Sequence, residues 1–209
     1  RFPDQKALFN GLRQQFEWVN ERVAAVQPLR FTVGDEFQAA YSDVVSAFRA
    51  VLLLRLKFRA MKSAIDQAPA PMSKQQVRIG LSYGEISVFQ EDREPYGQSG
   101  EAWWNARKAI EHAEGPRSQH NEPLSSLTRF HGPDVRLTAM TNAFWLAIDQ
   151  VLFRMDRTDV EITLAMLTGR KQVEIAVMLG LSQPVISRRA KRNGVFTVLK
   201  VLEELAGIP

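Results

Sequence analysis

The stretch that decides how this chain is interpreted is Gln172-Val-Glu-Ile-Ala-Val-Met-Leu-Gly-Leu-Ser-Gln-Pro-Val-Ile-Ser-Arg-Arg-Ala-Lys-Arg192. Ala176 lies four residues before Gly180, and Ile186 lies six residues after it. A small side chain lets two helices touch, and glycine permits the left-handed conformation that a tight turn requires. Ile186 is then placed to pack the second helix onto the first. The spacing predicts a helix-turn-helix.

The flanking residues predict where the second helix begins and ends. Ser182 is a favourable N-cap residue, and Pro184 is tolerated in a first helical turn. Gly194 suits the position just after a helix C-terminus. These signals agree with the turn at Gly180, so the second helix should span most of the residues between Ser182 and Gly194.

One side of this second helix carries residue types that read DNA. Gln183, Ser187, Arg188 and Lys191 share its exposed side, and glutamine and arginine can bind adenine and guanine edges through two hydrogen bonds. Arg189 and Arg192 lie further round and suit phosphate contacts, as does the helix N-terminus. The predicted contacts to double-stranded DNA are Gln172, Ser182, Gln183, Ser187, Arg188, Arg189, Lys191 and Arg192.

The charge of the chain is concentrated in the same region. The formal net charge is +4, yet Ser182–Lys200 alone contains five basic residues and no acidic one. A short basic segment of this kind is typical of a surface that binds polyanions. The alternative is a helix pair that serves only in packing or dimerisation.

Length and composition set the broad class. The 209 residues suffice for one large or two small domains, and 45% of them are hydrophobic, so a buried core is expected. The absence of cysteine excludes disulfides, cysteine-ligated zinc and thiol catalysis, and it fits a reducing cytoplasm. The longest apolar run, Ala50–Leu54, is too short to span a membrane. Because the chain starts at Arg1 and not at Met, we expect that residues precede it.

Periodicity predicts mixed elements upstream and helices downstream. Helices are expected at Asp4–Ala25, Asp43–Met61 and Gly100–Ala113, and strands at Leu29–Val33, Phe37–Tyr41, Val77–Tyr83 (continuing to Phe89) and Leu127–Phe130. The first two strands should form a hairpin with a type II′ turn at Gly34-Asp35. Two glycines on one face of the third strand, Gly80 and Gly84, leave room for another backbone or a ligand.

Strand signals stop before Pro133, so the predicted division is residues 1–133 and residues 134–209. Helices are expected from Asp134 to about Met155 and from Asp156 to Leu167. One additional strand before Arg1 would give the upstream domain a β-α-β-β-α-β, ferredoxin-like plan. The predicted fold is therefore α+β, with an all-α helix-turn-helix domain following.

Three upstream motifs together resemble the nucleotidyl cyclase fold. They are Val33-Gly-Asp-Glu-Phe37, Arg78-Ile-Gly-Leu-Ser-Tyr-Gly-Glu85, and Gly100 leading into the helix with Asn105-Ala-Arg107. With the helix-turn-helix, where Glu174-Ile-Ala176, Leu179-Gly180 and Ser182–Ser187 match a bacterial regulator pattern, the whole chain resembles the SatD family. That resemblance implies a cyclase-like domain followed by a DNA-binding tail.

The resemblance also implies candidate ligands. Asp35 matches the hairpin carboxylate that binds Mg²⁺ in active cyclases, and Arg78, Asn105 and Arg107 are candidates for nucleotide binding. Asn105 and Arg107 are two residues apart where class III cyclases have a spacing of four, and Val33 stands where diguanylate cyclases have glycine. Catalysis, retained binding of a metal or nucleotide, and a turn aspartate without a ligand all stay open.

Two functions follow, with a third behind them. The first is a transcription regulator that binds DNA as a homodimer through its tail, with the upstream domain as sensor or dimerisation module. The second is a metal-dependent, nucleotide-processing enzyme with an accessory helix-turn-helix. The third is an interaction module whose helical tail binds protein. The residue patterns favour the first function and a protein that is not an enzyme.

Overall fold

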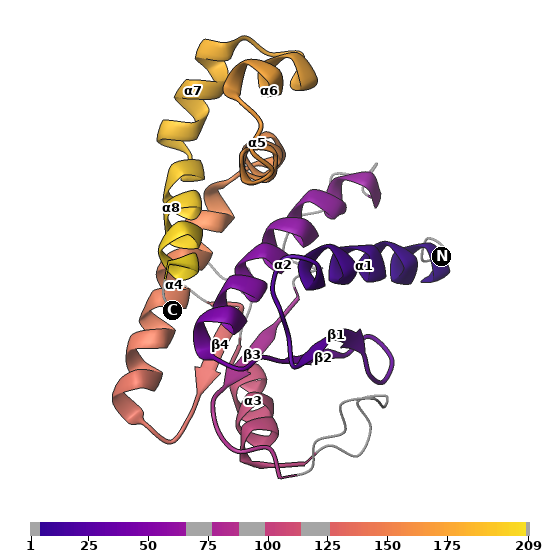
Figure 1. The fold of residues 1–209 in the computed structure, drawn as a ribbon, viewed down its shortest axis with the longest axis vertical. Coiled ribbons are helices and arrows are strands. Elements are labelled where there is room, and N and C mark those ends of the chain that lie inside the picture. The colour runs from indigo at the N-terminus through magenta and orange to yellow at the C-terminus, as the bar shows by residue number, and fades with distance from the viewer. Residues whose placement is uncertain (1–4, 66–76, 88–98, 114–125, 208–209) are drawn as a thin grey trace, which may run out of the picture. The chain divides into compact units, whose positions relative to one another are not determined.

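The computed structural model describes residues 5–65, 77–87, 99–113 and 126–207 (Figure 1). Within these ranges the chain is a mixed α+β protein with eight helices and two two-stranded sheets. Its C-terminal region is largely helical. The predicted α+β class is therefore confirmed.

The described residues group into two compact units that are interleaved along the chain. One unit contains residues 5–24, 48–65 and 151–207, and the other contains residues 25–47, 77–87, 99–113 and 126–150. This grouping places the first helix with the C-terminal helices and so differs from a division at Pro133. The predicted domain boundary itself stays a prediction.

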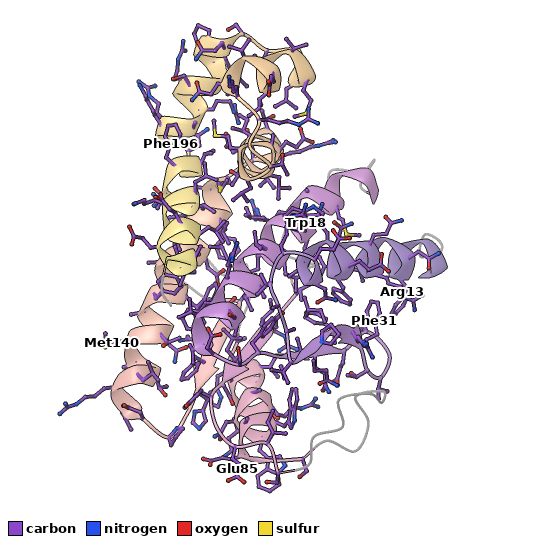
Figure 2. The ribbon with its side chains drawn as sticks, viewed as in Figure 1. Arg13, Trp18, Phe31, Glu85, Met140 and Phe196 are labelled. Carbon is purple, nitrogen blue, oxygen red and sulfur yellow. The ribbon has the colours of Figure 1, made fainter. Side chains whose placement is uncertain are left out.

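The first unit begins with α1 (Gln5–Asn20), five residues shorter at its end than predicted. Its apolar stripe is buried at Phe16 and Val19, as the spacing predicted. The Phe16 ring lies 6.2 Å from the ring of Phe58 on α2 (Val44–Ile65). The Arg22 guanidinium lies over the ring of Trp18, which is labelled in Figure 2, at 3.8 Å from the ring centroid. Lys57 of α2 also lies over the Trp18 ring, at 4.7 Å, so Trp18 and Phe16 both hold α1 against the part of α2 that belongs to the same unit.

The predicted hairpin is present in the second unit. β1 (Gln27–Phe31) pairs antiparallel with β2 (Phe37–Ala40), with Phe31 opposite Phe37. Gly34 has φ 62°, and no non-glycine residue in the described ranges has positive φ, as expected when a type II′ turn has glycine at its first central position. The Glu36 amide donates to the Val33 carbonyl at 3.1 Å. The paired residues of the two strands are symmetric about Gly34, so the connection contains three residues, Val33 to Asp35, and the predicted two-residue connection is wrong.

A strand-helix-strand unit completes the second unit. β3 (Ile79–Ser82) pairs in parallel with β4 (Thr128–His131), and α3 (Glu101–Glu111) lies between them in sequence. A Cβ on Gly80 would lie only 2.1 Å from the Ala106 carbonyl oxygen of α3, which confirms close backbone approach at that glycine. The predicted continuation of the strand through Glu85–Ser87 is wrong, and Val88-Phe89 lies outside the described residues.

A buried carboxylate fixes the start of β4. Asp149 is fully buried, and its Oδ2 accepts hydrogen bonds from the Leu127 amide at 2.8 Å and the Ser126 hydroxyl at 2.8 Å. In the described residues the four strands form two sheets. The single ferredoxin-like sheet therefore stays a prediction.

The chain ends in a series of helices. They are α4 (Val135–Arg154), α5 (Arg157–Leu167), α6 (Gln172–Leu179), α7 (Gln183–Arg192) and α8 (Val195–Ala206). α5 to α8 belong to one unit, and Ile162, Ile175, Ile186 and Val198 are fully buried in it. Within the ranges that the structure describes, no helix combines the length and apolar character needed to cross a bilayer.

Candidate nucleic-acid interface

The turn between α6 and α7 has the geometry that the sequence predicts. Gly180 adopts the left-handed conformation, with φ 64° and ψ 31°, and the Leu181 amide donates to the Ala176 carbonyl at 2.9 Å. No atom lies within 4 Å of the place where a Cβ on Gly180 would sit. The glycine is therefore required for its backbone conformation and not for space.

The inner face of α7 packs on the neighbouring helices of its unit. Ile186 and Ala190 of α7 are fully buried, and Ile175 and Ala176 of α6, the helix that packs against it, are also buried. These side chains fix the distance and rotation of α7 relative to α6. The outward side of α7 is thus presented by a packed support.

Both ends of α7 lie where the cap residues predicted them. Ser182 occupies the N-cap position in an extended conformation, although its hydroxyl makes no capping hydrogen bond, and Pro184 lies in the first turn. Asn193 is the C-cap, and Gly194 follows with φ 86°. A Cβ on Gly194 would lie 2.5 Å from Cγ1 of Val151, so this glycine is needed for space as well as conformation.

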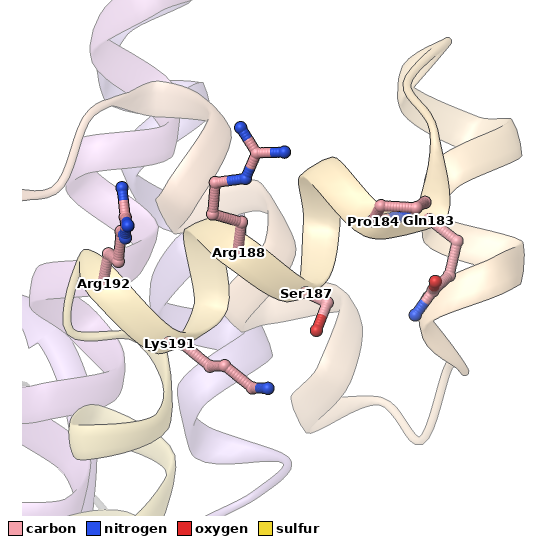
Figure 3. A pocket seen from close by; sticks show the side chains of 6 residues that line it. All are labelled: Gln183, Pro184, Ser187, Arg188, Lys191 and Arg192. Atoms are coloured by element: carbon pink, nitrogen blue, oxygen red, sulfur yellow. The ribbon is translucent and has the colours of Figure 1, made fainter.

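The outer face of α7 forms one shallow hollow. Figure 3 shows that its lining side chains all come from α7, and they are Gln183, Pro184, Ser187, Arg188, Lys191 and Arg192. Arg188, Lys191 and Arg192 are exposed, and Ser187 is half-buried. The structure therefore brings together five of the eight residues predicted to contact DNA.

The cations on this face differ in their ion pairing from exposed cations on α5 and α8. Within the described part of the chain, Arg188, Lys191 and Arg192 form no intramolecular ion pair. Arg157, by contrast, pairs with Glu161 at 2.6 Å, and Lys200 pairs with Glu204 at 3.0 Å. Three neighbouring positive charges on one exposed face therefore have no counter-ion among the described residues.

Arg189 lies in a different place from the one predicted. Its Nε donates to Asp159 Oδ1 at 2.9 Å, and its Nη2 donates to Asp156 Oδ2. Asp159 is only 1% exposed, so this arginine faces inward and neutralises a buried carboxylate. The hydrogen bond that Arg189 donates to the Asp156 carboxylate raises the pKa of the guanidinium above its ordinary value. We therefore leave Arg189 out of the set of candidate DNA contacts.

Three residues of this inward cluster were not predicted as a group. Asp156 caps α5 by accepting from the Asp159 amide at 3.0 Å, and Asn193 Nδ2 donates to Asp159 at 3.1 Å. Partial burial would raise the pKa of Asp156, but the hydrogen bonds from Arg189 and the Asp159 amide hold it below its usual range. The only sequence signal was the Asp-x-x-Asp spacing at the start of α5, which is typical of a capping box.

Gln172 and Gln183 meet across the turn. Gln183 Nε2 donates to Gln172 Oε1 at 2.9 Å, although the two residues are 11 apart in sequence. Each is the first residue of its helix. The two glutamine side chains therefore form one polar edge beside the cations of α7.

The upstream candidates do not converge in the same way. Arg107 is exposed and pairs with Glu36 of the hairpin at 3.0 Å, whereas Asn105 is buried on the other side of α3. Side chains two residues apart on a helix point in nearly opposite directions, so Asn105 and Arg107 cannot contact the same nucleotide from α3. Asp35 is exposed at the hairpin tip, and Arg78 is exposed just before β3. Among the described residues, no group of three or more histidines and carboxylates could hold a metal ion.

The α6–α7 region thus combines a rigid turn, a packed inner face and an outer face with three unpaired cations and two amide side chains. Comparisons of the chain with protein-family models, with curated proteins and with solved structures gave no match.

Proposed function

We propose that this protein is a transcription regulator that binds double-stranded DNA through the outer face of α7. The observation that carries the proposal is the charge arrangement on that face. Arg188, Lys191 and Arg192 are exposed and unpaired within the described residues, while Arg189 between them is neutralised inside. A protein surface that leaves three adjacent cations unneutralised suits a polyanion, whose phosphates supply the counter-charges.

The shape of the region suits duplex DNA. The major groove is wide enough for one α-helix, and a helix-turn-helix inserts its second helix there with the N-terminal residues against base edges. Gln183 lies at that N-terminus, and Arg188 follows on the same outer side. Phosphate contacts are assigned to Ser182, Lys191 and Arg192. The Ser182 hydroxyl makes no capping hydrogen bond, so it can donate to a phosphate oxygen.

The upstream part is assigned to regulation or dimerisation in this proposal. A single helix-turn-helix buries little surface, so binding as a homodimer to half-sites roughly 34–36 Å apart is expected. The upstream motifs resemble a nucleotidyl cyclase-like, ferredoxin-like domain of the SatD family, and a bacterial cytoplasmic regulator fits that resemblance. We do not propose nucleotide chemistry, because Asn105 and Arg107 face different sides of α3.

The test is retention of sheared genomic DNA fragments by the intact protein at two salt concentrations. The Arg188→Ala plus Arg192→Ala variant should bind at least about 10-fold more weakly at low salt. The slope of log affinity against log salt should fall in magnitude by roughly 1, because the phosphate contact of Arg192 is lost while Arg188 is assigned to base edges.

A matched control removes the same charge elsewhere. Arg157→Ala plus Lys200→Ala deletes two exposed cations that pair with glutamates on α5 and α8. This control should retain DNA within about two-fold of the wild type if α7 is the interface. Equal losses of affinity in both variants would mean that net charge alone, and not the α7 face, causes the effect. If the wild type retained no DNA at low salt, the proposal would be wrong.

A further inference from the structure

Gln172 and Gln183, the first residues of α6 and α7, form a hydrogen bond that fixes the orientation of the Gln183 side chain. Both backbones are held in place, because α6 is fixed by buried Ile175 and α7 by buried Ile186, with Gly180 setting the turn between them. Gln183 is exposed, yet its side chain is directed by the 2.9 Å hydrogen bond to Gln172. An exposed glutamine normally samples many rotamers, so this contact selects one orientation before any ligand is bound.

The hydrogen bond leaves a defined set of groups on Gln183. A glutamine amide carries two N–H donors and one carbonyl acceptor. One Nε2 hydrogen of Gln183 is used by Gln172 Oε1. We assign to this bond the hydrogen trans to Oε1, which leaves the cis hydrogen and Oε1 side by side along the free edge of the amide, as one donor next to one acceptor.

Only one base offers the complement of that edge in the major groove. Adenine presents the N7 acceptor beside the N6 donor, so it can form two hydrogen bonds with the free edge. Guanine presents two acceptors, and its O6 would oppose Oε1 of Gln183. Thymine presents an acceptor beside a methyl group, and cytosine presents a donor without the adjacent N7 acceptor.

We propose that Gln183 reads adenine in the DNA half-site and that Gln172 is the positioning residue that orients it. This inference rests on the proposed function, since it needs α7 to lie in the major groove. The ligand is duplex DNA with an adenine at the base pair that faces the N-terminus of α7. The cations further along α7 supply affinity that does not depend on this base.

The experiment selects duplexes from a pool with a randomised 20-base-pair core, using the intact protein, followed by sequencing. The wild type should enrich one adenine in each half-site. Gln183→Ala should lose that preference, a change of roughly 5- to 100-fold in discrimination at that position. Gln172→Ala should lower the preference several-fold at the same position while leaving the other positions and the salt dependence unchanged.

Two further variants separate positioning from general damage. Gln172→Glu keeps an acceptor for Gln183 Nε2, so the adenine preference should return even if the added charge weakens overall affinity. Gln14→Ala, which removes an exposed glutamine of α1, should behave like the wild type.

The outcomes also distinguish this inference from the proposed function. If the wild type retains no duplex from the pool, both fall. If the wild type enriches duplexes but shows no adenine at the position that Gln183→Ala alters, only the inference is overturned. The inference is also overturned if Gln172→Ala keeps the adenine preference, or if it alters a different position from Gln183→Ala.

Discussion

The two faces of α7 use the same residue type for opposite purposes. Arg188 is exposed without an ion pair in the described residues, whereas Arg189, one residue later, pairs with Asp159 and Asp156. Successive residues of an α-helix are about 100° apart, so one step carries a side chain from the outer to the inner face. A basic run therefore does not show which of its members are available to a ligand. The partners supplied by neighbouring helices decide that.

The inner arginine has a physical requirement behind it. Asp159 is 1% exposed, and a buried carboxylate is strongly unfavourable unless it is paired and hydrogen-bonded. Arg189 and Asn193 together supply those bonds from α7 and its C-cap. The outer arginines form no ion pair with a carboxylate among the described residues, so their removal should leave folding almost unchanged.

The difference between the two faces can be tested by removing one arginine from each face. Arg189→Ala should lower the free energy of unfolding by about 2–4 kcal/mol, because it leaves the buried Asp159 with too few partners. Arg192→Ala should change it by no more than about 0.5 kcal/mol, as for an ordinary surface position. Urea unfolding of the intact variants measures both values. Equal effects would mean that the faces are not distinct.

A smaller effect is expected at the turn that sets the direction of both faces. Gly180→Ala should cost about 1–2 kcal/mol, entirely from the left-handed backbone conformation, because no atom lies near the new Cβ. Gly207→Ala is the control, since Gly207 has φ −85° and only ordinary contacts near its Cβ. The same urea measurement should show no loss for the control. A similar loss at both glycines would contradict the requirement for left-handed geometry at Gly180.

The smallest effect concerns the pH dependence of the inner cluster. The pKa of Asp156 is below its usual range, so the carboxylate stabilises the fold above the unfolded-state pKa near 4 and loses that contribution as pH falls through the lower folded-state pKa. Asp156→Asn should therefore lose less stability than the wild type on acidification below about pH 4. Thermal unfolding across pH 2–6 measures the difference.

A second background checks the origin of that pH dependence. In Arg189→Ala the main partner of Asp156 is gone, so adding Asp156→Asn should alter the acid loss less than it does in the wild type. An unchanged difference would assign the acid sensitivity to groups other than this pair.

Local signals in the sequence were sufficient for several parts of the structure. The turn at Gly180, the ends of α7 and the hairpin at Gly34 each depend on glycine or cap residues that act within a few positions. The room beside Gly80 was also predicted from the strand pattern, although the pattern did not identify α3 as its neighbour. Short-range chemistry fixes these features, and it is visible in the order of residues.

Features that depend on distant neighbours were not predictable in the same way. The inward direction of Arg189 requires Asp159, which is 30 residues earlier, and the Gln172–Gln183 contact forms only after the turn closes. The place of Arg107 likewise depends on Glu36, which is 71 residues away. No periodicity in the sequence reports such pairs, because each is a consequence of tertiary packing.

The anchoring of α7 by Arg189 also bears on how fast the proposed complex would form. A recognition helix that is already folded and clamped to α5 has no ordering step left to complete when DNA arrives. Association would then be limited by encounter and by electrostatic steering from the outer cations, and its rate constant would fall as ionic strength rises. Arg189, although it would contact no DNA itself, would in this way help to determine the association rate of the face that does.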